Sequence, residues 1–256
     1  MAYKYHIPYG NHCSQFGELR IPKKLKLSPV IVTIHGGFWQ SKYDLYENDS
    51  ICEDLTRRGF ATWNIEYRRV GENGGGWPGT FNDVIAAVNY LRQLKKSYPI
   101  DLRNVIIIGH SAGGHLGLWL AARAKMVNGA KYFTELNVPI QKVISLAGVT
   151  DLKTMWKIHK EQGIKNVVGD LMEGSPIDHV KRYTISSPME LLPMDTEQIL
   201  IHGDLDKHVP VQLSRDYYMK LKKTGGNVSF IELKDVEHFK IIDPQSNAWE
   251  SVIHSI

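Results

Sequence analysis

The sequence predicts an α/β protein with a mostly parallel central sheet and helices on both faces. Three observations support this fold class. Short apolar runs rich in β-branched residues alternate with longer amphipathic segments. The runs are apolar almost throughout, which is typical of strands buried on both faces. Alternating strands and helices give a parallel sheet with right-handed crossovers. The 256 residues suit one domain over 1–256.

The individual strands and helices follow from these patterns. Two short runs near the N-terminus, in KYHIPYG and QFGELRIP, predict a leading antiparallel pair. Parallel strands are predicted at residues 30–34, 60–65, 104–109, 142–147, 198–203 and 227–233. Helices are predicted at residues 81–96, 112–124 and 211–226, the last ending in lysines and glycines that favour termination.

One long segment, about 153–195, interrupts the alternation. It contains no clear strand and is too long for an ordinary connection between a strand and a helix. We expect a short helical lid over the carboxyl edge of the sheet, which is where ligands bind in open α/β sheets.

The composition excludes several classes of protein. The net charge is +4 and the lysines are dispersed, so we expect no nucleic-acid partner. No apolar run approaches the ~18 residues of a membrane span, and the first ten residues lack the apolar core of a secretory signal. The two cysteines, Cys13 and Cys52, define no disulfide framework. We therefore expect a soluble cytoplasmic protein without a membrane partner; its oligomeric state stays open, with a homodimer as one option.

The sequence GHSAGG (109–114) lies between the predicted strand 104–109 and the predicted helix 112–124. Small residues around a serine permit a sharp strand-to-helix turn that lifts the hydroxyl clear of the sheet. The amides at the start of the helix can then stabilise negative charge nearby. A phosphate-binding turn is the alternative, but the G-x-G-x-x-G spacing and the P-loop lysine are missing. The pattern predicts Ser111 as a nucleophile.

A serine nucleophile needs a histidine base that is oriented by a carboxylate. After such a turn, the acid and then the histidine are expected in later loops. His238 follows the predicted strand 227–233 and is the predicted base. Asp204 and Asp206 both follow the strand 198–203. Asp206 is preferred because it lies further into the loop, whereas Asp204 is expected to brace the turn.

A metal site is the rival interpretation of this stretch. If the segment were extended, one face would carry His202, Asp204, Asp206 and His208. Two histidines and two carboxylates could bind zinc or manganese. The turn signals and the proline at 210 argue against a long strand there. We therefore predict neither a metal nor an organic cofactor.

An oxyanion hole requires two amide donors. One is predicted to be Ala112, directly after the nucleophile, and the other is expected in the loop HGGFWQ (35–40). Gly36 and Gly37 would let this backbone approach a ligand closely. Aromatic side chains beside these glycines, and after the run of glycines at 74–76, are predicted to wall a substrate pocket. They are Phe38, Trp39 and Trp77.

Two charged residues, Glu66 and Arg68, follow the predicted strand 60–65. One interpretation is a structural ion pair between them. The other is that Arg68 clamps a substrate carboxylate, which would favour an amino-acid-derived substrate such as N-formylkynurenine.

The motifs HGGFW, GHSAGG, HGDLDKHVP and EHF, in this order, resemble those of the α/β-hydrolase fold over nearly the whole chain. The segments IEYRRVGENGGGWPGTFNDV and EGSPIDHVKRYTISSPMELLP look like those of small single-domain esterases and kynurenine formamidase-like hydrolases. The resemblance implies a catalytic triad and an oxyanion hole. The triad would be Ser111, Asp206 and His238, and the residues near the oxyanion would be Gly36, Gly37 and Ala112. Since this family also contains deacetylases and peptidase relatives, the resemblance does not fix the substrate.

The predicted function is therefore a serine hydrolase that cleaves a small carboxylic ester through an acyl-enzyme intermediate. The first alternative is an aryl formamidase, which would cleave an N-formylkynurenine-type amide with the same residues. The second is a non-enzymatic ligand-binding protein of the same fold, which the complete set of serine, aspartate and histidine disfavours.

Overall fold

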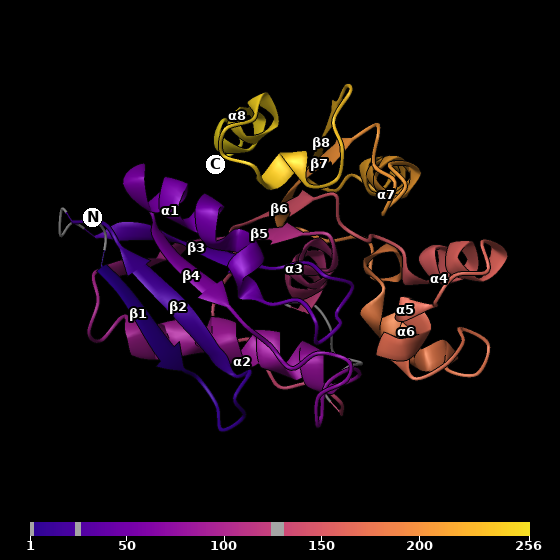
Figure 1. Cartoon of the computed structure of the whole chain (residues 1–256), viewed down its shortest axis with the longest axis horizontal. Coiled ribbons are helices and arrows are strands. Elements are labelled where there is room, and N and C mark those ends of the chain that lie inside the picture. The colour runs from indigo at the N-terminus through magenta and orange to yellow at the C-terminus, as the bar shows by residue number, and fades with distance from the viewer. Residues whose placement is uncertain (1–2, 24–26, 124–130) are drawn as a thin grey trace.

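The computed structural model describes residues 3–23, 27–123 and 131–256 (Figure 1). Within these residues eight strands form one sheet in the order β1-β2-β4-β3-β5-β6-β7-β8. The pairings of β1 with β2 and of β2 with β4 are antiparallel, and β3 to β8 are parallel. The strands are β1 (Tyr3–Pro8), β2 (Phe16–Ile21), β3 (Ser28–Ile34), β4 (Ala61–Ile65), β5 (Ile100–His110), β6 (Lys142–Leu146), β7 (Glu197–Gly203) and β8 (Val228–Leu233). The predicted mostly parallel sheet and its leading antiparallel pair are confirmed.

Helices cover both faces of the sheet and bury two separate apolar cores. On one face, α1 (Asp49–Arg57) and α8 (Asn247–Ile253) pack on isoleucines of the central strands. The other face carries α2 (Gly79–Leu94), α3 (Ala112–Arg123) and α7 (Gln212–Lys223). Figure 1 shows α1 and α8 on one side of the sheet and α2 on the other. The last residue of the predicted helix 112–124, Ala124, lies outside the described residues.

Helix α1 was not predicted from the sequence. Its residues Ile51, Cys52 and Leu55 are buried, and they lie on one side of a single two-and-a-half-turn helix. A 3₁₀ helix, η1 (Leu45–Asn48), leads directly into it. The segment is short and rich in charged residues, so the apolar periodicity that reveals longer helices is weak here.

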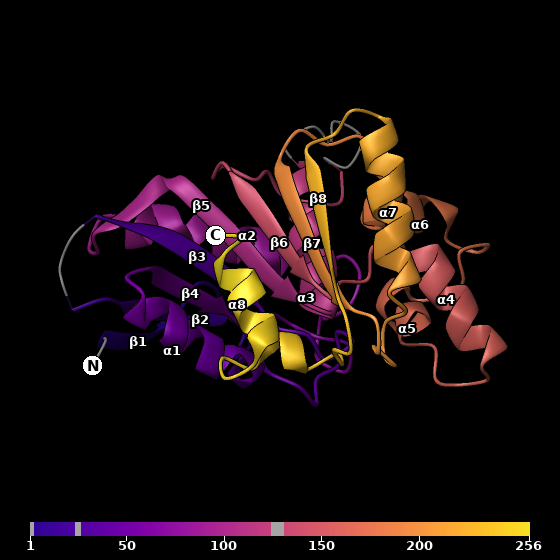
Figure 2. The ribbon, with the colours of Figure 1, turned by 90° about the horizontal axis from the view of Figure 1, so that it is seen from above.

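The predicted helical excursion between β6 and β7 is present. It contains α4 (Leu152–Glu161), α5 (Val167–Met172), α6 (Val180–Ser186) and the 3₁₀ helix η2 (Pro188–Glu190). Figure 2 shows α4, α5 and α6 grouped beside α7. The ring of His159 on α4 meets the ring of Phe38 edge-on, with centroids 6.0 Å apart. The excursion therefore touches the loop that follows β3.

None of the helices within residues 3–23, 27–123 and 131–256 is both long enough and apolar enough to span a membrane.

Candidate active site

Ser111 occupies the junction between β5 and α3. The strand ends at His110 and the helix begins at Ala112, so the turn is a single residue. Ser111 has a φ of 54°, a left-handed conformation that is uncommon for residues other than glycine. Its amide donates a hydrogen bond to the carbonyl oxygen of Leu146 at the end of β6, at 2.8 Å. The neighbouring strand therefore holds the backbone of this strained turn, as expected for a nucleophile elbow.

The glycines of the elbow are required by contacts between backbone atoms. A Cβ atom on Gly109 would lie 2.2 Å from the carbonyl oxygen of Gly113. A Cβ atom on Gly113 would lie 2.0 Å from the carbonyl oxygen of Ile34, at the end of β3. Neither oxygen can move without distorting the sheet or the helix. The small residues that the motif predicted are therefore those that let α3 pack against the end of β3.

We expect Gly113→Ala to lower the free energy of unfolding by at least about 2 kcal/mol, because the added methyl group collides with backbone. Gly117→Ala in the same helix is the control. There the methyl group meets only side-chain atoms of Ile107 and Val143, at 3.1 and 3.4 Å, and alanine favours helix formation. Urea denaturation measures both. Equal stability of the two variants would contradict the backbone-clash explanation.

Asp206 and His238 come together from the loops after β7 and β8. The distance from Asp206 Oδ2 to His238 Nδ1 is 2.5 Å. The other oxygen, Oδ1, accepts hydrogen bonds from the amides of His208 and Val209 at 2.8 and 2.9 Å. Burial alone would raise the pKa of Asp206, but hydrogen bonds from two histidines and from the backbone lower it strongly. Asp206 is therefore held as a charged acceptor against His238.

His202 is a partner of this carboxylate that the sequence analysis did not place in the triad. Its Nε2 lies 3.1 Å from Asp206 Oδ2 and 2.9 Å from the carbonyl oxygen of Val209. Both oxygens only accept, so we assign the proton to Nε2 and let Nδ1 accept from the hydroxyl of Ser214, 2.7 Å away. Asp204 instead accepts the amide of Asp235 at 2.7 Å. These hydrogen bonds use three of the four side chains of the rival metal site, those of His202, Asp204 and Asp206, to brace the two loops.

The structure brings Ser111 beside the aspartate–histidine pair through its neighbour His110. The rings of His110 and His238 have centroids 4.5 Å apart, and His110 Nε2 lies 3.2 Å from the carbonyl oxygen of His238. Among the described residues no hydrogen bond joins Ser111 Oγ to His238. Catalytic hydrogen bonds often tighten only once a substrate is bound, so this geometry agrees with the predicted triad but does not complete it.

The loop after β3 lies directly against the nucleophile. A Cβ atom on Gly36 would be 3.1 Å from Ser111 Cβ. The amide of Gly36 differs from the expectation, because it donates to Glu47 Oε2 at 2.5 Å and is not free for an oxyanion. Gly37, with a φ of 86°, and Ala112 remain as candidate donors. The amide of Ala112 is the first in α3 and has no acceptor within the helix.

The three aromatic residues predicted to wall one pocket lie in three different environments. Trp39 is completely buried and packs edge-on against the ring of His115, so its predicted place in an open pocket is wrong. Phe38 is half-buried next to the excursion helix α4. Trp77 lines a cavity of about 390 Å³ together with Tyr132 and residues 178–182, none of which belongs to the predicted triad. Of the three, Phe38 best fits a substrate contact.

Arg68 does not have the geometry of a free carboxylate clamp. Its guanidinium forms a two-pronged ion pair with Asp83, with Nε 2.8 Å from Oδ2 and Nη2 2.7 Å from Oδ1. Glu66 does not pair with Arg68. Its Oε1 lies 2.9 Å from His35 Nε2 and its Oε2 accepts the amide of Leu45 at 3.0 Å. Both interpretations of the Glu66 and Arg68 segment are therefore replaced by two separate structural contacts.

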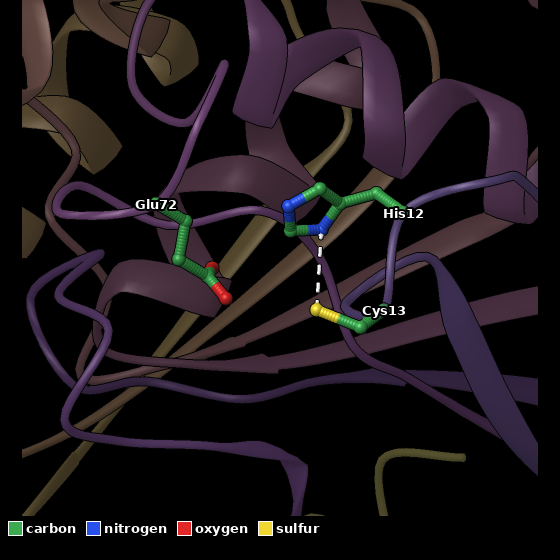
Figure 3. Close-up of side chains that lie close together, drawn as sticks. All are labelled: His12, Cys13 and Glu72. Atoms are coloured by element: carbon green, nitrogen blue, oxygen red, sulfur yellow. Dashed lines mark hydrogen bonds between the residues drawn. The ribbon is translucent and has the colours of Figure 1, made fainter.

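A second group of potential ligand atoms, outside the predicted triad, is found in His12, Cys13 and Glu72 (Figure 3). These atoms are within 4.8 Å of one another. The carboxylate of Glu72, however, already accepts from Arg69 Nε at 3.1 Å and Nη2 at 3.2 Å. The guanidinium supplies the positive charge that a metal ion would bring. We therefore assign Glu72 to the ion pair with Arg69.

For His238 as the predicted base, the pKa of its side chain sets the expected acid limit of activity. Burial lowers this pKa, and although Asp206 raises it, the charge of His110 lowers it further, to about 4. A general base must be neutral, so we expect protonation of His238 below about pH 4 to remove activity, whereas a base with an ordinary histidine pKa would lose it near 6.5. We expect kcat/KM for an uncharged ester to stay level from pH 7 to about pH 5. Circular dichroism at each pH monitors folding. A fall centred near pH 6.5 in folded enzyme would contradict this prediction.

The strand order, the strained elbow at the end of β5 and the loops at the carboxyl ends of β3, β7 and β8 define an α/β hydrolase. Solved structures with the same fold include a truncated carbohydrate esterase from gut microbiota, with a TM-score of 0.81 and 22% identity, covering 100% of this chain and 94% of that one. Esterase B of Lactobacillus rhamnosis aligns with a TM-score of 0.84 and 18% identity, covering 99% and 84% of the two chains. Residues 18–221 match the BD-FAE family, and the chain belongs to that family.

The curated relatives include enzymes with different leaving groups. Esterase LipC of Mycobacterium tuberculosis is 22% identical over 93% of this chain. The chain spans about 60% of the length of LipC. Kynurenine formamidase of Drosophila melanogaster is 23% identical over 93% of this chain and 75% of its own length. This is therefore an esterase-like hydrolase family that also includes formamidases.

Proposed function

We propose that this protein is a serine hydrolase that cleaves small carboxylic esters through an acyl-enzyme intermediate on Ser111. The observation that carries the proposal is the hydrogen bond of 2.5 Å between Asp206 and His238, formed in loops that meet beside the strained Ser111. A buried aspartate that fixes a histidine ring next to an elbow serine is the arrangement that activates a hydroxyl for attack.

The proposed reaction proceeds in two halves. His238 Nε2 accepts the proton of Ser111 as its Oγ attacks the carbonyl carbon of the ester. The resulting oxyanion is stabilised by the amides of Ala112 and Gly37. His238 then gives the proton to the leaving alcohol, and the same residue activates a water molecule that hydrolyses the acyl-enzyme. Asp206 keeps the proton of His238 on Nδ1 throughout, so that Nε2 is free to act as the base.

Aryl formamidase activity is the second candidate, and the similarity to kynurenine formamidase supports it. The same residues could protonate an amine leaving group. The ion pair between Arg68 and Asp83 removes one reason to favour it, because Arg68 is not available to hold the carboxylate of an amino-acid-derived substrate. We therefore place the ester first.

Two measurements on the wild-type protein test this proposal. A fluorophosphonate probe followed by peptide mapping should place the adduct on Ser111. The kcat/KM values for p-nitrophenyl acetate and N-formylkynurenine should then be compared side by side. Preference for the acetate supports the esterase, and a strong preference for the formamide moves the assignment to formamidase. A protein that neither reacts with the probe nor hydrolyses either substrate would be a ligand-binding member of the fold.

A further inference from the structure

Glu47 and His110 connect the loop after β3, the elbow at Ser111 and the loop that carries His238. Neither residue takes part in the reaction proposed above. Glu47 lies on η1, and its Oε2 accepts the amide of Gly36 at 2.5 Å. The same oxygen lies 3.2 Å from His110 Nδ1. His110 immediately precedes the nucleophile, so one carboxylate oxygen joins the loop after β3 to the elbow.

His110 makes the second half of the link. Its Nε2 lies 3.2 Å from the backbone carbonyl oxygen of His238. The side chain is inaccessible to solvent, so water cannot replace either contact. Both neighbouring oxygens can only accept, and a histidine ring satisfies two such acceptors only when both of its nitrogens carry a proton. Each nitrogen of the His110 ring therefore faces an oxygen acceptor, one on Glu47 and one on the backbone of His238.

We propose that Glu47 and His110 are positioning residues. They fix the loop 35–40, which carries a candidate oxyanion donor, and the loop of His238 relative to Ser111. This inference rests on the proposed serine hydrolase function. With Gly36 held by Glu47, the backbone turns at Gly37, whose amide is one of the two candidate oxyanion donors. With His110 bonded to the carbonyl of His238, the base cannot drift away from the elbow. The two loops are then held beside the nucleophile before substrate arrives, and the hydrogen bond between Ser111 and His238 is left to form on binding.

The pKa values of Glu47 and His238 are both shifted by the charge of His110, as its contacts with these two residues lead one to expect. Burial would raise the pKa of Glu47, but the charge and hydrogen bond of His110, with the Gly36 amide and the charge of His35, lower it to about 2. The groups that act on His238 are Asp206, which raises its pKa, and His110 and His208, which lower it. Because the charge of His110 lowers the pKa of His238, a variant that lacks this side chain should raise that pKa.

Two substitutions test the two contacts. Glu47→Gln removes the charge but keeps the side-chain length, and Glu53→Gln on the exposed side of the neighbouring helix α1 is its control. We expect Glu47→Gln to lower kcat by about 10- to 100-fold and to change KM by less than about threefold, because alignment is lost rather than substrate binding. The control should keep kcat within about twofold.

His110→Gln tests the link to the base, with the exposed His254→Gln as its control. We expect kcat to fall by about 10- to 100-fold and the acid limb of kcat/KM to rise by about one pH unit, because a positive charge beside His238 is removed. If His110 only supported the fold, the pH at which kcat/KM falls in acid would stay the same in His110→Gln. Should His110→Gln fail to fold, Glu47→Gln decides the matter, since the Glu47 side chain is partly exposed and better tolerates replacement.

Reaction with the fluorophosphonate probe separates the outcomes. If wild-type Ser111 is not labelled, the proposed function fails. If wild type is labelled and both variants keep its kcat and its acid limb, the function stands and the positioning pair is overturned. Folded variants with lower kcat, slower labelling and, for His110→Gln, a raised acid limb support the pair. Losses that only follow the unfolded fraction, measured by thermal melting, overturn it.

Discussion

Replacing Ser111 with alanine is expected to lower kcat for p-nitrophenyl acetate by about 10⁵- to 10⁶-fold, with little change in KM. The substitution removes the only group that can form the acyl-enzyme in the proposed reaction, while the oxyanion amides and the pocket remain. Alanine is also smaller than serine and adds no atom to the crowded elbow. Steady-state kinetics with purified variants, supported by loss of fluorophosphonate labelling, measures the effect.

The control for this prediction is a second buried serine, which lies in the central sheet. Ser145 lies on β6, and its hydroxyl has no hydrogen-bond partner among the described residues. Ser145→Ala should therefore leave kcat within about threefold of wild type and should not reduce stability. Residual activity of Ser111→Ala above about one part in a thousand would assign the chemistry to a different nucleophile.

Replacing Asp206 with asparagine is expected to lower kcat by about 10⁴-fold. The amide of asparagine can present its NH₂ group to His238 Nδ1, which forces the histidine proton onto Nε2 and leaves no base for Ser111. At higher pH, Asp206→Asn should regain part of its lost kcat only if a group other than His238 accepts the proton of Ser111. A pH series of kcat/KM, with circular dichroism to confirm folding, measures the effect.

Asp204→Asn is the matched control because it changes the same residue type two positions earlier in the same loop. Asp204 accepts the amide of Asp235 and does not contact His238, so kcat should change by less than about threefold. If the two variants lose activity equally, the loop as a whole matters and Asp206 has no special role. If only Asp204→Asn loses activity, the assignment of the acid is wrong.

Local patterns in the sequence were sufficient to predict the sheet and the elbow. The strands are continuous apolar runs, so burial on both faces can be inferred without any tertiary contact. The glycines around Ser111 follow from the backbone crowding of a single-residue turn, which is a local requirement as well. The pairing of Asp206 with His238 was predictable only because parallel strands all end at one edge of a sheet.

The features that the sequence analysis missed depend on contacts between distant segments. Nothing near Trp39 in the chain shows that His115 packs on its ring, or that the indole is fully buried. Arg68 looks free until α2 brings Asp83 beside it. Glu47 lies in a charged segment that predicts no element, and its role depends on His110, which is 63 positions away. Such pairs are set by tertiary packing, which periodicity does not report.

The carboxylate of Asp206 also connects catalysis to the folding equilibrium. Its pKa is depressed in the folded protein, so its hydrogen bonds stabilise the fold above the unfolded value near 3.9 and are lost as protons bind below it. The base that Asp206 orients gains its own proton at about pH 4. Acid therefore removes the activity near pH 4, whereas the stability contributed by Asp206 declines over a wider interval, from about pH 4 down towards its depressed folded pKa. An enzyme engineered to work below that interval would need a new anchor for these loops as well as a different base.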